Sequence, residues 1–92
     1  MAISSKDRKE LKARAHHLKP VIRIGQKGIT ENLVLETDLA LNIHELIKVH
    51  IAMDEKEQRK ESGHALASQC QAEEVDYIGK IMILYRPKKE EA

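Results

Sequence analysis

Residues 18–33, LKPVIRIGQKGITENL, place a β-branched run between a proline and two glycines and then enter a helical pattern. Pro20 disfavours α geometry in the residue before it and removes a backbone donor, so it separates this run from anything helical upstream. The run 21–24 therefore predicts a strand, and Thr30 is suited to cap a helix that extends to about Ile43. A helix that separates two successive strands implies parallel crossover pairing, which indicates a sheet covered by helices.

A first helix is expected before this unit. Ser4 followed three residues later by Asp7 resembles a capping box, and the helical pattern runs to about His17. One face of this helix would pack and the opposite face would be basic. The packing face holds Leu11, Ala15 and Leu18, and the basic face holds Lys6, Lys9, Lys12, Ala13, His16 and His17.

The second helix, which follows Thr30, carries apolar residues almost all round, so we expect it to be mostly buried. Residues 46–52 alternate, with Ile47, Val49 and Ile51 on one side and Lys48 and His50 on the other, which predicts a second strand. The apolar positions of the second helix are Leu33, Val34, Leu35, Leu39, Ala40, Leu41 and Ile43.

A third helix should begin at Asp54, with Glu57 completing its start signal, and residues 73–86 predict a hairpin that turns at Gly79 and Lys80. The order α-β-α-β-α-β-β predicts an α/β (α+β) fold, a two-layer sandwich with a four-stranded mixed sheet. We expect one domain over residues 1–92, with a frayed tail at 87–92. The third helix would pack through small residues at Gly63, Leu66, Ala67 and Cys70.

Charge is sorted along the chain although the net charge is only +1. Residues 1–28 hold eight Lys and Arg against two acids, whereas residues 29–79 hold four against eleven. A local basic segment favours a polyanionic partner, because phosphate affinity depends on local charge. A solvated helix face would give the same pattern.

Composition excludes several classes of function. With two Tyr, no Trp and no Phe, the chain lacks the ring cluster on which RRM sheets and OB-folds stack bases. The chain shows neither a signal-peptide pattern nor an apolar run long enough to cross a bilayer, so we expect a cytoplasmic protein with no membrane partner. The lone Cys70 agrees with a reducing compartment.

The turn Gly25-Gln26-Lys27-Gly28 has the parts of a phosphate clamp. Glycines allow positive φ and close approach of the backbone, the following helix offers free N–H groups, and Lys27 adds a cation. A tight connection between strand and helix would also explain the two glycines. The Walker and dinucleotide-binding patterns are absent.

Three separated motifs, LKPVIRIGQKGITENL, HELIKVHIA at 44–52 and YIGKIMILYRP at 77–87, resemble the bacterial YhbY-type proteins, which are stand-alone CRM (chloroplast RNA splicing and ribosome maturation) domains. The resemblance covers essentially the whole chain. It implies a fold like the C-terminal domain of bacterial translation initiation factor 3, and RNA binding on precursors of the large ribosomal subunit.

The resemblance also implies the contact residues. RNA would meet the GxxG loop at Gly25, Gln26, Lys27 and Gly28; because the first variable position is Gln26, Lys27 carries the charge of the loop. A KH domain uses the same four-residue clamp between two helices, whereas a strand precedes the loop here. The flanking basic candidates are Lys6, Lys9, Lys12, Arg14, Lys19 and Arg23.

Other chemistries fit less well. The five His and Cys70 show no metal-ligand spacing, Cys70 lies on an apolar stripe, and no catalytic set stands out, so we expect a non-enzyme without cofactor, metal or small-molecule substrate. We also expect a monomer. Two alternatives to RNA binding remain: a protein-interaction module of the ribosome that uses the acidic middle segment, and a DNA-binding protein.

Overall fold

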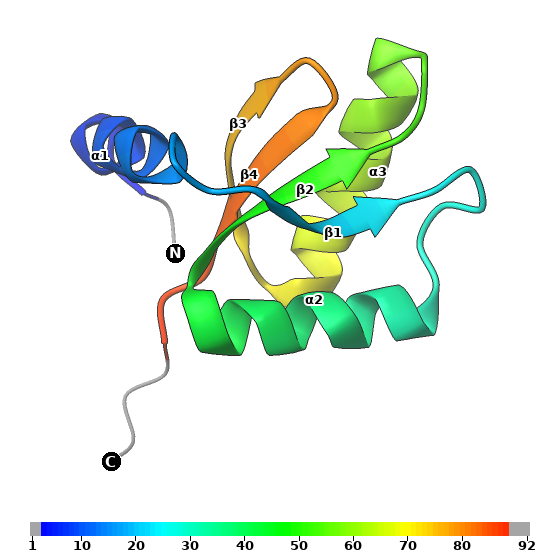
Figure 1. Cartoon of the computed structure of the whole chain (residues 1–92), viewed down its shortest axis with the longest axis horizontal. Helices are drawn as coiled ribbons and strands as arrows, with labels where there is room; N and C mark the ends of the chain where they lie inside the picture. The colour runs from blue at the N-terminus through cyan, green and yellow to red at the C-terminus, as the bar shows by residue number, and fades with distance from the viewer. Residues whose placement is uncertain (1–2, 89–92) are drawn as a thin grey trace.

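The computed structural model describes residues 3–88, and in them it shows three helices and four strands in the predicted order (Figure 1). The α/β (α+β) class with a four-stranded mixed sheet is confirmed. The helices are α1 (Ser5–Ala15), α2 (Glu31–His44) and α3 (Lys56–Cys70). The strands are β1 (Pro20–Ile24), β2 (Leu46–Ile51), β3 (Glu73–Ile78) and β4 (Ile81–Tyr85).

The sheet has the strand order β1-β2-β4-β3. β1 runs parallel to β2, with α2 as the crossover between them, whereas β2 with β4 and β3 with β4 are antiparallel pairs. Gly79 and Lys80 close the β3–β4 hairpin as predicted. The positive φ of Gly79, 60°, at the first turn position is typical of a type II′ turn, a type that suits the twist of a hairpin.

The main core lies between one face of the sheet and the helices α2 and α3. Ile47, Val49 and Ile51 of β2 all point into it, as the alternation predicted. The predicted packing stripe of α3 is also confirmed, since Gly63, Leu66, Ala67 and Cys70 are its buried residues. A Cβ at Gly63 would lie 2.6 Å from the hydroxyl of Tyr77, so the missing side chain lets α3 approach the sheet.

A smaller apolar cluster lies on the opposite face of the sheet, under α1. Figure 1 shows α1 and α3 on opposite sides of the sheet, so α1 adds a partial cover to the predicted sandwich. Arg8 fastens α1 by donating to the main-chain carbonyls of Glu74 and Val75, at 2.9 and 2.6 Å. The cluster consists of Leu11, Ala15, Leu46, Val75 and Ile83.

The prediction that α2 is mostly buried was wrong. Thr37 and Leu41 are its only fully buried residues, whereas Leu35, Leu39 and Ile43 are 62%, 62% and 65% exposed. A helix laid on one face of a sheet can bury only the stripe that faces it, and these three side chains lie on the outer stripe. We call them the α2 stripe.

The N-caps of α1 and α2 were predicted correctly, and that of α3 was not. The hydroxyl of Ser4 accepts from the N–H of Asp7, and that of Thr30 from the N–H of Leu33, each at 3.1 Å, so both predicted caps are confirmed. Asp54 does not cap α3, because Glu55 is the N-cap residue and makes no side-chain cap bond. Asp54 instead pairs with Lys80 across the loops, at 3.1 Å.

The end of α1 differs in detail from the prediction, and the predicted C-terminal tail is described only in part. α1 ends at Ala15, two residues early, and Leu18 lies outside it with 37% exposure. Of the tail predicted at 87–92, Pro87 and Lys88 are exposed and have no regular structure, and 89–92 lie outside the described residues.

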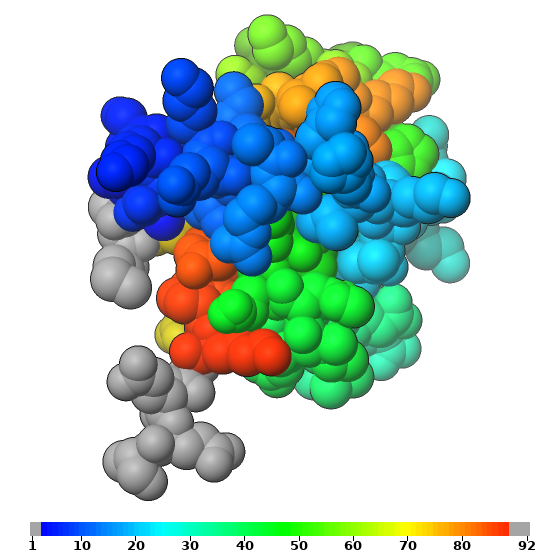
Figure 2. Space-filling model, turned by 60° about the vertical axis from the view of Figure 1, so that its left-hand side comes forward, coloured from blue at the N-terminus to red at the C-terminus, as the bar shows by residue number. Residues whose placement is uncertain are grey.

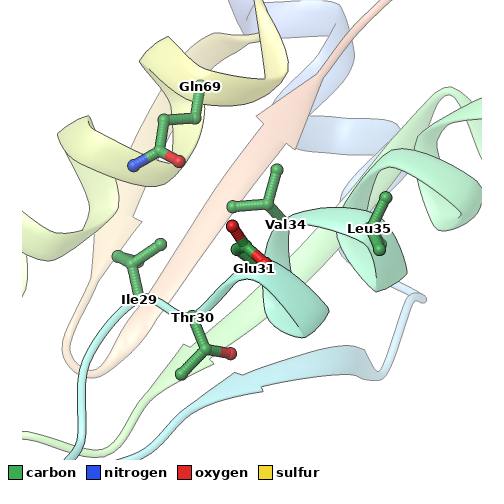
Figure 3. A pocket seen from close by; sticks show the side chains of 6 residues that line it. All are labelled: Ile29, Thr30, Glu31, Val34, Leu35 and Gln69. Carbon is green, nitrogen blue, oxygen red and sulfur yellow. The ribbon is translucent and has the colours of Figure 1, made fainter.

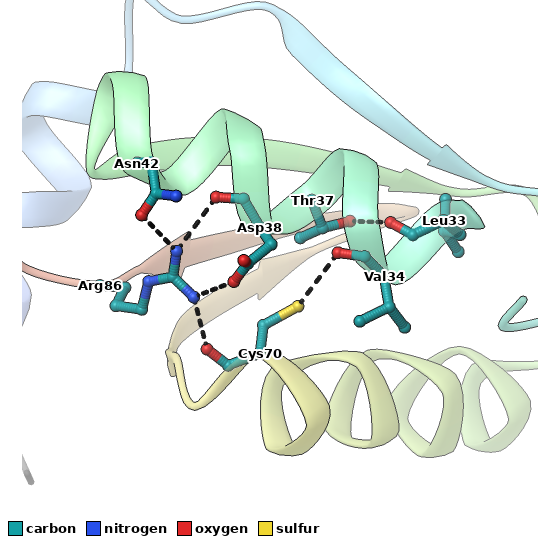
Figure 4. Close-up of polar contacts among 7 residues, drawn as sticks. All are labelled: Leu33, Val34, Thr37, Asp38, Asn42, Cys70 and Arg86. Atoms are coloured by element: carbon teal, nitrogen blue, oxygen red, sulfur yellow. Dashed lines mark hydrogen bonds and ion pairs between the residues drawn. The ribbon is translucent and has the colours of Figure 1, made fainter. Parts of the chain in front are cut away.

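Arg86, just after β4, joins the sheet to both helices of the main layer (Figure 4). Its guanidinium donates to the carboxylate of Asp38, to the carbonyl of Asp38 at 3.0 Å, to Asn42 Oδ1 at 2.9 Å and to the carbonyl of Cys70 at 2.8 Å. The side chain of Arg86 is only 17% exposed. One residue therefore ties the C-terminal half of α2 and the C-terminal end of α3 to the end of the sheet.

Candidate functional site

The Gly25–Gly28 loop is a closed turn at the surface between β1 and α2. The N–H of Gly28 donates to the carbonyl of Gly25 at 3.0 Å. Gly28 has φ 77°, in the left-handed region that favours glycine, whereas Gly25 does not have a positive φ. The loop therefore requires the left-handed backbone conformation at Gly28. The N–H of Gly28 already donates within the loop and is not available to a ligand.

Two loop amides have no hydrogen-bond acceptor among the described residues. Gln26 and Lys27 are exposed, and their N–H groups donate to no acceptor in residues 3–88. A Cβ built at Gly25 would lie 3.5 Å from Nη1 of Arg23, so a guanidinium rests against the loop. Two cations and two main-chain donors thus meet at this turn, which suits an anionic group.

A shallow concavity of about 440 Å³ surrounds the loop. It contains Arg23 and the four loop residues, and no carboxylate contributes to its lining. The remaining lining comes from Thr30 and Leu33 of the start of α2. The positive charge of the loop is therefore not neutralised within this concavity.

The N-terminus of α2 adds less to the site than the sequence predicted. One of its free N–H groups, that of Leu33, is taken by the hydroxyl of Thr30. Glu31, in the first turn, is exposed and already complements the positive end of the helix dipole. The loop itself, rather than the helix end, is the stronger anion-binding element.

The cations predicted on the first helix differ in how available they are. Lys6 and Lys9 are exposed and form no ion pair with another described residue. Lys12 pairs with Asp76 at 3.3 Å. Arg14 is exposed and shares a small concavity with two acids of its own helix, Asp7 and Glu10.

α1 and the Gly25–Gly28 loop do not converge. They lie beyond opposite ends of β1 (Figure 1), and Lys19 and Arg23 occupy the segment between them. In the space-filling view the blue surface of α1 continues into the lighter blue of the segment leading to β1 (Figure 2). The structure thus groups Arg23 with the loop residues, and separates both from Lys6, Lys9, Lys12 and Arg14.

Lys48 and His50 of β2 were not predicted as site residues. Both are half-buried, and strand register places Lys48 beside Pro20 and His50 beside Arg23. The alternation of β2 had already assigned them to the side away from the main core. What the sequence could not show is that β1 would pair next to them, because pairing depends on the fold.

A second concavity of about 490 Å³ lies between α2 and α3 (Figure 3). Ile29 and Val34 face Gln69 of α3 across it, and Leu35 connects it to the α2 stripe. Its one charged lining residue is Glu31. This surface is apolar with an acidic border, unlike the surface of the loop.

Other kinds of site find little support in the described residues. Within residues 3–88, no three His, Cys, Asp or Glu side chains gather into a metal-binding group, and no helix is long and apolar enough to cross a membrane. The thiol of Cys70 is buried and lies 3.8 Å from the carbonyl oxygen of Val34. Burial, and next the carboxylate of Asp38, raise the pKa of Cys70, which disfavours a reactive thiolate.

Comparison with known proteins gives consistent results. The family model of the CRS1 / YhbY (CRM) domain matches residues 3–86. An "RNA-binding protein" of Haemophilus influenzae is 42% identical over 88 residues, covering 96% of this chain and 89% of the relative. The "Probable RNA-binding protein YqeI" of Bacillus subtilis is 31% identical and covers 96% of this chain and 92% of the relative.

A solved structure agrees with the fold. The solution structure of a hypothetical protein from Staphylococcus aureus matches with a TM-score of 0.85 and 33% identity, over 99% of this chain and 95% of that one. Sequence and backbone comparisons therefore point the same way over nearly the full length.

Proposed function

The chain belongs to the CRS1/YhbY (CRM) domain family, and from that premise we propose that it binds RNA through the Gly25–Gly28 loop. The observation that carries the proposal is the loop itself. It presents Lys27, the adjacent guanidinium of Arg23 and two main-chain N–H groups that have no acceptor among the described residues. The concavity around them is lined by no carboxylate. Main-chain donors and cations of this kind bind phosphate without reading sequence.

The cationic face of α1 is the second part of the proposed contact. Lys6 and Lys9 are exposed, and they would position the RNA on the protein rather than read its bases. The expected partner is ribosomal RNA in precursors of the large ribosomal subunit, in the cytoplasm. Shape, rather than base sequence, would then guide the choice of site.

The loop is tested by Lys27→Ala. Loss of one phosphate contact should weaken RNA binding and reduce the slope of log K against log salt by about 0.7 to 1. The replacement Lys60→Ala, at an exposed position of α3, is the matched control and should leave both unchanged. Affinity measured over a range of salt concentrations gives both quantities, and an unaltered slope for Lys27→Ala would refute the loop contact.

A double change gives a stronger test. Replacing Gln26 and Lys27 with Asp should abolish RNA binding by repulsion, while circular dichroism remains that of the parent protein because both side chains are exposed. Loss of the circular dichroism signal would instead show that the loop is required for folding.

The α2 stripe favours a second candidate function, a protein-interaction module of the ribosome. Three large apolar side chains on one exposed helix face, next to the concavity in Figure 3, are typical of a protein contact surface. The two functions are separated by nuclease treatment. If the protein still sediments with ribosomal precursors after nuclease and has no affinity for naked RNA, the protein contact is the correct function.

A further inference from the structure

Part of the sheet face that carries α1 remains accessible beyond the helix. α1 packs on two neighbouring rows of this face, the row of Leu46 and Tyr85 and the row of Lys48 and Ile83, in which Lys48 is still half-buried rather than covered. Strand register places Arg23, His50 and Ile81 side by side in another row of the same face, on β1, β2 and β4. Arg23 is exposed and the other two are half-buried, so this row is open to a ligand.

A shallow concavity of about 550 Å³ lies over this row. Lys19, Val21, Arg23, His50 and Ile81 contribute to its lining. Arg23 lines both this concavity and the one around the Gly25–Gly28 loop. The open sheet face is therefore continuous with the loop site.

The charge of this face is positive and uncompensated. The side chains of Lys48 and His50 form no ion pair or hydrogen bond with any residue in the range 3–88. Asp76 lies on the same face, since both Asp76 and Lys48 pair with Ile83, but Asp76 is engaged by Lys12. Among the described residues, no carboxylate is therefore paired with the side chain of Lys48 or His50.

Apolar side chains accompany these cations. Val21 and Ile78 are 53% and 57% exposed, and register places Ile78 beside Ile81. Riboses and unstacked bases can contact such side chains, and His is among the rings on which bases stack, whereas a duplex keeps its bases inside. The mixture suits an unpaired strand better than a duplex.

We propose that Lys48 and His50, with Arg23, extend the RNA site across the sheet, so that an unpaired RNA strand passes from the Gly25–Gly28 loop over β1 and β2 to α1. This inference rests on the proposed function. It also explains how two cationic elements at opposite ends of β1 (Figure 1) can serve one ligand, because the open sheet face connects them.

The test compares variants of the full chain for binding to a labelled single-stranded RNA of about 20 nucleotides, long enough for one small domain. Lys48→Gln removes the charge and keeps the first two methylenes of the stem. It should lower affinity several-fold and reduce the salt slope by about 0.7, the value for one phosphate contact on a single strand. Lys48→Arg should retain the slope, and Lys60→Gln on α3 should behave as the parent protein.

Thermal unfolding of each variant shows whether a loss of binding reflects a loss of fold. Should Lys48→Gln be unstable, His50→Gln provides the second variant, and it too should weaken binding several-fold. Competition with a duplex of the same sequence at matched salt tests whether the protein prefers unpaired RNA to double-stranded RNA. The unpaired strand should compete better, and equal competition by the duplex overturns the assignment of an unpaired strand.

The outcomes separate this inference from the proposed function. If Lys27→Ala weakens binding but Lys48→Gln and His50→Gln do not, the loop contact stands and the sheet contact is overturned. If Lys48→Gln weakens binding and Lys27→Ala does not, the sheet contact stands and the loop contact is overturned. If none of these variants affects binding, both are overturned.

Discussion

The two glycines of the Gly25–Gly28 loop differ at the scale of single residues. Gly28 has φ 77°, and Gly25 does not lie in the left-handed region. Replacing Gly28 with Ala should therefore lower the free energy of unfolding by about 1 kcal/mol, the cost of forcing a Cβ into that region. Gly25→Ala should change it by less than about 0.5 kcal/mol, because its Cβ would meet only ordinary contact. Denaturant titration of both variants measures this, and equal losses would contradict it.

Arg86 is the residue whose loss should destabilise the fold most directly. It is largely buried and donates to three different residues of α2 and α3. Arg86→Ala should lower the free energy of unfolding by about 2 to 4 kcal/mol, because the carbonyl of Cys70 and the carboxylate of Asp38 lose their donor. Arg86→Lys should restore only part of this, since an ammonium cannot reproduce the planar fork.

Denaturant titration measures the effect of these Arg86 variants, with Arg14→Ala as the control. Arg14 is exposed on α1, which packs on the sheet face opposite the main layer, so its loss should have little effect on stability. An Arg86→Lys protein as stable as the parent would show that charge alone, and not the fork, holds the helix ends.

Two groups should make stability fall at alkaline pH. Burial raises the pKa of Cys70, and burial together with the hydrogen bond to Glu74 raises the pKa of Tyr77. A raised pKa means that the folded state favours the protonated form. Stability is then fully present below the ordinary values of 9.0 and 10.0, and it is lost as pH rises toward the folded pKa values.

Unfolding midpoints followed from neutral to alkaline pH test this dependence, with Cys70→Ser and Tyr77→Phe each removing one of the two groups. The alkaline loss should become smaller in each variant. A pH profile that is the same in the parent protein and both variants would show that other groups are responsible.

At the scale of elements, α2 offers an internal comparison between its two faces. Leu41 is fully buried, whereas Leu39, two residues before it, is 62% exposed. Leu41→Ala should cost about 2 to 5 kcal/mol of unfolding free energy, and Leu39→Ala less than about 1 kcal/mol. Equilibrium denaturation compares the two. A large loss for Leu39→Ala would mean that another part of the molecule covers the α2 stripe in solution.

Local signals allowed most elements to be predicted. Ser4 and Thr30 cap their helices because a side-chain oxygen needs only the next turn to find an N–H. Asp54 satisfied the same sequence pattern, but its carboxylate pairs with Lys80, which lies 26 positions away in the sequence. The exposure of the α2 stripe also escaped prediction, because apolar residues around a helix do not tell which of its faces the sheet will cover.

At the scale of the whole molecule, the mixed sheet followed from the order of elements, but the placement of α1 did not. The sequence gives α1 one apolar stripe, and either face of the sheet could have received it. Placement of α1 opposite α2 and α3 leaves the rest of that face open beside Lys48 and His50. The loop residues were predicted together from a local motif, whereas this neighbouring surface required strand pairing.

β1 is an edge strand of the sheet, and its composition has a consequence for self-association. Edge strands can template pairing with another chain, and proline, charged side chains and irregular register all prevent this. β1 has each of these: Pro20, the cation Arg23, and a register shift between Pro20 and Ile22. Neutralising the basic residues along this edge to weaken RNA binding should therefore also make the protein more prone to aggregate.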